Sequence, residues 1–254
     1  MFDSYKYPIS LKSLSLSLND KTDLKGDVKS ITLDLPKGSL NIILGPENSG
    51  KSSLCKKLAG IDRNISGQIL YFGMPFDRIK KQNFLLYIPS SNIFFENRKV
   101  IENLVILGEF ANIPLKYIEK RIKKISPFYS LENIKNIKLT KLSKAIKSVL
   151  ILCLIEIVLP EIVIISAQDF YGDELLEEFF FKRLVNLKNL GMTIIVSTQR
   201  FSNIDNSDNI ILLSDSKPVF VGNPVELLNI NNPNDIQLTL LKKIEKSYER
   251  IKIN

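Results

Sequence analysis

The sequence contains no histidine and only two cysteines among its 254 residues. The missing histidine excludes acid–base catalysis by an imidazole and any metal site built from histidines. Two thiols are too few for the disulfide framework of a small secreted domain. Cys55 and Cys153 both lie between apolar residues of expected helices, which indicates reduced thiols in the core of an intracellular protein.

The sequence also lacks a long apolar run that is free of charge. The longest one, from Val149 to Ile165, is interrupted by Glu156, Pro160 and Glu161. A membrane-spanning helix over this run would bury two carboxylates beside a helix-breaking proline. The run instead predicts the end of a helix, a turn at Pro160 and a buried strand from Ile162 to Ile165.

The charge is unbalanced, with 35 Lys and Arg residues against 27 Asp and Glu, a net charge of +8. Such a balance is compatible with a nucleic-acid or anionic-membrane partner. The basic residues are nevertheless scattered, and their densest cluster, Lys120 to Lys124, follows an amphipathic helical pattern. We therefore expect no nucleic-acid partner.

The apolar pattern divides the chain into three kinds of segment. Period-two alternation from Ile9 to Leu18 and from Ser30 to Leu35 predicts an N-terminal β-hairpin. From about Val100 to Val158 the period is helical, which predicts an inserted helical segment. The remaining chain alternates between expected strands (40–44, 68–72, 84–88, 162–165, 193–197, 210–213, 218–221) and expected helices (50–58, 174–190, 225–228, and a tail helix from about 233). This alternation is typical of an α/β fold.

A glycine-rich loop between an expected strand and an expected helix carries the clearest chemical signal. Its sequence, GPENSGKS from Gly45 to Ser52, fits GxxxxGK[ST] without a mismatch. In such a loop, backbone N–H groups surround a phosphate, Lys51 reaches the β and γ oxygens, and Ser52 is placed to ligate Mg²⁺. A chance glycine turn would match in on the order of one per cent of chains of this length. We predict that ATP and Mg²⁺ bind here, through Gly45, Pro46, Asn48, Ser49, Gly50, Lys51, Ser52 and Ser53, with Ser52 as the metal ligand.

With this loop as its first landmark, the chain resembles the nucleotide-binding subunit of ABC transporters over nearly all of its length. Leu58 to Gly60 and Ser66 to Ile69 resemble the stretch after that family's phosphate loop. Val100 to Leu104, VIENL, resembles the "TVxENL" that opens the family's helical subdomain. Asp208 to Leu213 resembles its closing strand, and Gly222 to Leu227, GNPVEL, matches its "GxPxEL" in full.

The resemblance implies an α/β fold, a P-loop NTPase core of the ABC type with a mixed β-sheet flanked by helices. An N-terminal antiparallel β-subdomain and an inserted helical subdomain complete it. Residues 1–254 then form one nucleotide-binding domain, with the helical subdomain at about 90–158 and a C-terminal helix at about 233–251. Gly108, Asn112 to Pro114 and Ile118 to Ile122 resemble the energy-coupling-factor importers, which carry metal ions and vitamins; coincidental helical composition explains these residues equally well.

Several positions that carry the family's chemistry hold other residues in this chain. The strand from Ile162 to Ile165 is followed by Ser166 and Ala167, where the family has an Asp that holds Mg²⁺ through water and a Glu that polarises the attacking water. Ser90 replaces the family's loop Gln, and Gln199 replaces its switch His. A serine brings no charge to the metal and an alanine cannot act as a base. The resemblance therefore implies no catalytic residue at Ser90, Ser166, Ala167 or Gln199.

Other landmarks of the family are altered as well. Its signature LSGGQ falls at Leu142 to Ile146, LSKAI, which retains Ser143 but replaces both glycines. Side chains at these close-approach positions weaken the contact with a phosphate held by a partner subunit. The adenine-stacking aromatic would fall near Leu18, where none is present. Asp169 is the nearest carboxylate to the missing pair, and Asp173 retains the family's interfacial Asp, although helix N-capping explains Asp173 equally well.

The resemblance thus predicts the ATP-binding subunit of an ABC-type membrane transport complex, with little or no hydrolysis at its own site. The partners would be membrane-embedded permease subunits, docked through an apolar surface near Val100 to Phe110, and a second ABC-type subunit in a homodimer or heterodimer. Residues 1–8 lack the charged and apolar regions of a signal peptide. We therefore expect a cytoplasmic protein, peripheral on the inner face of the cell membrane through its partners.

Two alternatives remain at this level. The chain could be an active ATPase that energises transport as a homodimer, which turnover of the purified protein would distinguish. A DNA-maintenance ATPase of the same fold would instead carry a long coiled-coil insertion. Only about ninety residues without sustained heptads separate the phosphate loop from the signature segment, which disfavours that class.

Overall fold

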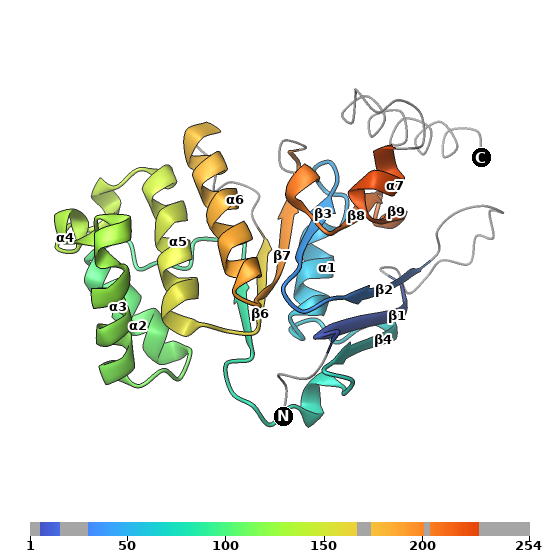
Figure 1. The fold of residues 1–254 in the computed structure, drawn as a ribbon, viewed down its shortest axis with the longest axis horizontal. Helices are drawn as coiled ribbons and strands as arrows, with labels where there is room; N and C mark the ends of the chain where they lie inside the picture. Colours follow the sequence, from blue (N-terminus) through green and yellow to red (C-terminus); the bar gives the residue numbers. More distant parts are fainter. Residues whose placement is uncertain (1–5, 16–29, 167–173, 201–203, 229–254) are drawn as a thin grey trace.

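The computed structural model describes residues 6–15, 30–166, 174–200 and 204–228 (Figure 1). Its strands are β1 Ile9–Ser15, β2 Ile31–Leu35, β3 Leu40–Leu44, β4 Ser66–Tyr71, β5 Leu85–Ile88, β6 Ile162–Ser166, β7 Thr193–Thr198, β8 Asn209–Ser214 and β9 Lys217–Gly222. Its α-helices are α1 Lys51–Leu58, α2 Val100–Phe110, α3 Leu115–Tyr129, α4 Leu131–Ile134, α5 Lys144–Val158, α6 Glu174–Asn189 and α7 Pro224–Leu228.

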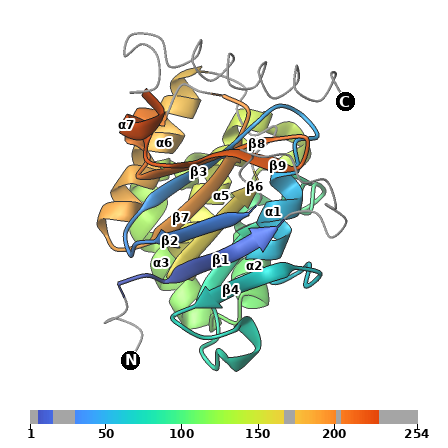
Figure 2. The ribbon, with the colours of Figure 1, turned by 90° about the vertical axis from the view of Figure 1, so that its right-hand side faces the viewer.

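The strands form two sheets. The larger has the order β5-β6-β7-β3-β8-β9 and is parallel except for β9, which pairs antiparallel with β8. The smaller has the order β2-β1-β4 and is antiparallel. Figure 2 shows the smaller sheet on the near side of the molecule, with α1 between it and the larger sheet. The mixed sheet and the N-terminal antiparallel unit predicted from the sequence are both confirmed.

Both faces of the larger sheet are buried, in two separate hydrophobic cores. Alternate residues of one strand point to opposite faces, so neighbouring residues of β3 and β6 belong to different cores. Ile43 and Ile164 pack with α1 and the smaller sheet, whereas Ile42 and Ile165 pack with α5, α6 and the helical segment. Burial on both faces explains why these strands are continuous apolar runs in the sequence.

The helices α2 to α5 form a separate group beside the larger sheet (Figure 1). In α3 the residues at spacings of three and four, Ile118, Ile122 and Ile125, are buried as the pattern predicts. The helix continues through Pro127 to Tyr129, beyond the last residue of that apolar pattern. Tyr129 is buried in the large core, which stabilises a turn that proline disfavours.

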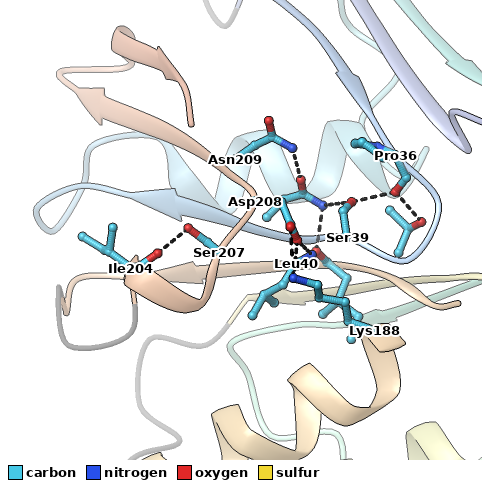
Figure 3. A network of polar contacts seen from close by, with 11 residues as sticks. Pro36, Ser39, Leu40, Lys188, Ile204, Ser207, Asp208 and Asn209 are labelled. Carbon is cyan, nitrogen blue, oxygen red and sulfur yellow. Dashed lines mark hydrogen bonds and ion pairs between the residues drawn. The ribbon is translucent and has the colours of Figure 1, made fainter. Parts of the chain in front are cut away.

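A polar network ties the amino ends of the central strands to α6 (Figure 3). The Asp208 carboxylate accepts a 2.7 Å hydrogen bond from the backbone N–H of Leu40. It also forms an ion pair with Lys188 at 2.7 Å. Asn209 donates to the side chain of Asn41 at 2.8 Å. These contacts fix β3 beside β8, and thereby fix where β3 ends and the glycine-rich loop begins.

Most predicted elements are present with shifts of one or two residues at their ends. The expected tail helix at 233–251 and the end of the first strand near Leu18 lie outside the described residues. The helix expected from Gly50 begins at Lys51, because Gly50 has a left-handed φ of 89° and serves as the N-cap. Within the described parts of the chain, no helix combines the length and apolar content that a membrane crossing requires.

Candidate functional site

The predicted site residues lie along the carboxyl edge of the larger sheet. Its parallel strands end there side by side, so the residues after β5, β6, β7 and β3 are brought together. Ser90 follows β5, Ser166 ends β6, Gln199 follows β7 and Gly45 follows β3. These residues thereby form one row, although they lie 30 to more than 150 positions apart in the sequence.

The glycine-rich loop has a backbone that depends on its glycines. A Cβ atom at Gly45 would lie 2.4 Å from the carbonyl oxygen of Leu213 and 2.5 Å from the Ser49 hydroxyl. Gly50 and Asn48 both have left-handed φ angles, of 89° and 59°. Glycine and asparagine adopt this conformation at the lowest cost, so the loop sequence suits its turn.

Lys51 closes this loop from within. Its side chain is only 1% exposed, and its ammonium donates to the carbonyl oxygens of Gly45 at 2.9 Å and Pro46 at 2.5 Å. Burial lowers the pKa of Lys51, and the charge of the exposed Glu47 offsets part of this effect. A buried ammonium beside the N-terminus of α1 is a strong electrostatic site for an anion.

Ser52, in the first turn of α1, faces the end of β6. Its hydroxyl and that of Ser166 are hydrogen-bonded at 3.3 Å, and Ser166 is fully buried. Ser197 pairs with Ser166 across the neighbouring strands, and its buried hydroxyl has no hydrogen-bond partner among the described residues. The predicted metal ligand Ser52 therefore contacts Ser166, whose side chain is a neutral hydroxyl.

Cys55 lies one turn further along α1 beneath these serines. Burial raises the pKa of its thiol to about 12, and the hydroxyls of Ser197 and Ser166 and the charge of Lys51 lower it by less. Tyr87 on β5 lies near Ser166, and burial raises the pKa of its hydroxyl. The Cys55 thiol and the Tyr87 hydroxyl therefore keep their protons at physiological pH. Among the described residues, no cluster of three His, Cys, Asp or Glu side chains is arranged to hold a metal ion.

The remaining predicted positions are less enclosed. Ser90 and Gln199 are exposed, and neither side chain forms a hydrogen bond with another described residue. Arg200, next to Gln199, forms an ion pair of 2.5 Å with the buried carboxylate of Glu177 on α6. Ala167, Asp169 and Asp173 lie outside the described residues. Pro46 is half-buried, Ser49 buried and Ser53 exposed at the loop and the start of α1.

The segment LSKAI forms the N-terminus of α5. Ser143 is the N-cap, and its hydroxyl accepts a hydrogen bond from the backbone N–H of Ile146 at 3.4 Å. Lys144, in place of a glycine, is exposed at this helix start. Lys147 forms an ion pair with Glu96 at 2.6 Å, which ties α5 to the loop before α2. Ser143 thus has a structural role in helix capping, independent of any ligand.

Three contributors to the site were not identified from the sequence. Tyr87, Cys55 and Ser197 surround Ser166. The parallel register of β5, β6 and β7 places Tyr87 and Ser197 there, and the packing of α1 against the larger sheet places Cys55 there. The Cys55 pattern indicated core burial, which the structure confirms, without indicating its neighbours. Pairing of Ser166 with Ser197 is a property of register, for which the separate strand patterns contain no signal.

Comparisons with known proteins agree with this architecture. A family model described as "ABC transporter" matches residues 28–165. The chain is 26% identical over 232 residues to the energy-coupling factor transporter ATP-binding protein EcfA of Methanocaldococcus jannaschii, covering 88% of this chain and 81% of that protein. It is 24% identical to the Nod factor export ATP-binding protein I of Cupriavidus metallidurans, over 84% of this chain and 73% of that protein.

Solved structures show the same fold. A structure titled as the ATP binding subunit of an ABC transporter superposes with a TM-score of 0.74 at 18% identity, covering 92% of this chain and 99% of that chain. The cbiO1 structure from Clostridium perfringens, described as part of the ABC transporter complex cbiONQ, gives a TM-score of 0.71 at 20% identity over 92% of this chain and 99% of that chain. At these identities the likeness establishes the fold alone.

Proposed function

The chain belongs to the ABC transporter family, and from this premise we propose that it binds ATP as a transport subunit with little or no hydrolysis at its own site. The observation that carries the proposal is the contrast between the two halves of the site. The phosphate loop is complete and its Lys51 is buried and charged, whereas Ser166 is a neutral hydroxyl where a metal-holding carboxylate is expected.

Nucleotide binding is supported by the geometry of the loop. Three features converge where phosphates would lie: the left-handed backbone at Asn48 and Gly50, the N-terminus of α1, and the Lys51 ammonium. Mg²⁺ would accompany the nucleotide, and Ser52 is the described residue placed to touch it. Removal of Asp and Glu from such a site costs a few kcal/mol of transition-state stabilisation for each, which together slows turnover by orders of magnitude.

Calorimetric titration with ATP tests the binding half of this proposal. Wild-type protein should bind ATP with a dissociation constant in the micromolar to millimolar range, a binding free energy of ~4 to 8 kcal/mol. The affinity should be this modest because the sequence has no aromatic residue near Leu18 to stack on the adenine base. Lys51→Ala should lose most of the affinity, since the ammonium is the buried cation of the loop. Lys56→Ala, an exposed lysine one turn along α1, is the matched control and should bind as wild type. Equal affinity of the Lys51→Ala variant would show that the loop is only a turn.

Docking on permease subunits is supported by an apolar groove beside α2. The groove has a volume of about 320 Å³ and is lined by Leu86, Ile88, Ile93, Leu107, Phe110, Leu154 and neighbouring residues. Phe110 is 71% exposed, and its ring lies 6.3 Å from that of Phe95, which is 43% exposed. Asn103, fully buried, holds the loop that carries Phe95 with hydrogen bonds to its backbone N–H and carbonyl. Exposed aromatic rings over an apolar groove are typical of a protein-binding surface.

Co-purification from native membranes tests this surface. A tagged chain should bring down membrane-embedded subunits and a second ABC-type subunit, all identified by mass spectrometry. Phe110→Glu should lose the membrane subunits, because a carboxylate would have to be buried in the groove. Leu190→Glu alters a 78% exposed leucine after α6 and should retain them. Equal recovery with both variants would place the docking surface elsewhere.

We further propose a transporter of the energy-coupling-factor type. The helical segment from Gly108 to Ile122 resembles those importers, and the similarity to EcfA extends over 88% of the chain. The same co-purification identifies the class, since the recovered membrane subunits would be those of such an importer. Recovery of an exporter's permease would overturn this assignment while leaving ATP binding intact.

A further inference from the structure

We propose that nucleotide binding at this site does not depend on Mg²⁺, because the described residues at the metal position are neutral hydroxyls. The inference rests on the proposed function, since it concerns the same loop. Mg²⁺ is usually held by one or two carboxylates together with phosphate oxygens and water. The residues of this site do not fit that pattern.

Two of the hydroxyl groups at the metal position are hydrogen-bonded to each other. Ser52 and Ser166 are hydrogen-bonded at 3.3 Å, and Ser166 has no exposed surface. The hydroxyl of Ser197 beside it is buried without a hydrogen-bond partner among the described residues. No carboxylate in the described part of the chain is hydrogen-bonded to any of these three serines. From the described residues, a divalent ion here would gain hydroxyl contacts and no opposite charge.

The positive charge of the loop also disfavours a bound metal ion. Lys51 brings a buried positive charge, with its ammonium on the carbonyls of Gly45 and Pro46. A dication bound nearby would repel this ammonium, and the carboxylate of Glu47, which acts on Lys51, is exposed to solvent. Metal-free nucleotide carries more negative charge and loses no protein–metal contact. The protein therefore has little differential affinity for the metal complex over the free nucleotide.

The test is titration of the purified full chain with ATP in excess Mg²⁺ and, separately, in excess EDTA. The two dissociation constants should agree within about threefold. A larger loss of affinity in EDTA would overturn the inference while leaving the proposed function standing. Absence of binding in both conditions, with the protein folded, would overturn the proposed function and this inference together.

A variant with a carboxylate at the end of β6 tests whether the missing charge at Ser166 explains the result. Ser166→Asp should bind at least about tenfold more weakly in EDTA than in Mg²⁺, because a carboxylate attracts the metal and repels bare phosphates. Ser166→Ala, which adds no charge, should retain a ratio near one. Equal ratios in the two variants would contradict the account.

Ser166 is fully buried, so a second variant, Ser52→Ala, tests the inference if Ser166→Asp does not fold. Ser52→Ala removes the hydroxyl placed toward the metal. If protein–metal contact contributes little, this variant should change the affinity by the same factor in Mg²⁺ and in EDTA. A loss confined to Mg²⁺ would show that Ser52 holds the metal and would overturn the inference.

Discussion

At the scale of single residues, a charged phosphate loop lies directly beside a cluster of neutral hydroxyls. Lys51 and Gly45 preserve the shape and charge of a phosphate loop. Ser166, fully buried beside Ser52, places a neutral hydroxyl at the end of β6. The neighbouring Cys55 is also buried, so the floor of the site consists of small, uncharged polar groups.

The thiol of Cys55 gives the protein a predictable response to alkaline pH. Burial raises its pKa to about 12 from an ordinary value of 9.0, so the native state retains a proton that the unfolded state loses. The free energy of unfolding should therefore fall as pH rises from about 9 toward 12. Buried Tyr71 and Tyr129, whose pKa values are also raised by burial, should add to this fall.

Denaturant unfolding between pH 8 and 10.5 measures this effect. Both cysteines should also resist alkylation at pH 8 in the native protein and react fully in denaturant, because the thiolate is the reactive form. Stability that rises above pH 9, or rapid alkylation of the folded chain, would show that these thiols are accessible.

Gly45 should tolerate no side chain. In Gly45→Ala the new Cβ would meet the Leu213 carbonyl and the Ser49 hydroxyl, so the loop must move, at a cost of about 1 to 3 kcal/mol. We expect a lower melting temperature together with about tenfold weaker ATP binding. Gly191→Ala is the control, because it strains a left-handed turn after α6 without a close contact. That variant should lose stability and retain its ATP affinity; loss of affinity in both variants would indicate general unfolding.

At the scale of helices and strands, one charged cluster joins the helical segment to the rest of the molecule. Arg183 on α6 forms two hydrogen bonds to the Glu156 carboxylate on α5, at 2.8 and 2.6 Å. The Tyr129 hydroxyl donates to the same carboxylate, and Phe128 lies under the guanidinium at 4.5 Å. This arrangement connects α3, α5 and α6 through largely buried charge.

Arg183→Ala should therefore destabilise the protein by about 2 to 4 kcal/mol, since it leaves the Glu156 carboxylate buried without its partner. Lys182→Ala breaks the exposed pair with Glu178 on the same helix and should cost less than about 0.5 kcal/mol. Urea unfolding of both variants measures the difference. Similar values for the two would mean that the Glu156 cluster is as weakly coupled as the surface pair.

Short motifs made several elements predictable because their interactions are local. In GNPVEL, Asn223 accepts from the backbone N–H of Glu226 at 2.8 Å, and Glu226 accepts from that of Asn223 at 3.3 Å, which is a reciprocal N-cap. In VIENL, Glu102 caps α2 and Asn103 holds the preceding loop. Such contacts span three to eight residues, so the sequence alone contains them.

Contacts between distant segments were not predictable in the same way. Lys188 meets Asp208, and Ser52 meets Ser166, only because the strand order brings those segments together. The apolar runs predicted that β6 and β7 are buried strands, but not that Ser197 lies opposite Ser166. The composition of the site floor therefore emerged from the fold, whereas the phosphate loop was evident from its own residues.

At the scale of the whole molecule, two cores hold the larger sheet between α1 with the smaller sheet and the helical group (Figures 1 and 2). The carboxyl edge of that sheet gathers the phosphate loop, Ser90, Ser166 and Gln199 into one row. The fold is thus that of an ABC transporter ATP-binding subunit, and we propose that the residues on this edge supply binding and little catalysis. Transport energised by ATP would then rely on the intact site of a second subunit.

Steady-state phosphate release by the purified chain tests this central claim most directly. Assays at saturating ATP and Mg²⁺, without any partner, should use Lys51→Ala as the blank. We expect release indistinguishable from that blank, because Ser166 brings no carboxylate to the metal and Ala167 offers no base. A Lys51-dependent turnover of about one per second or more, within the range of working enzymes, would contradict it and identify an active ATPase.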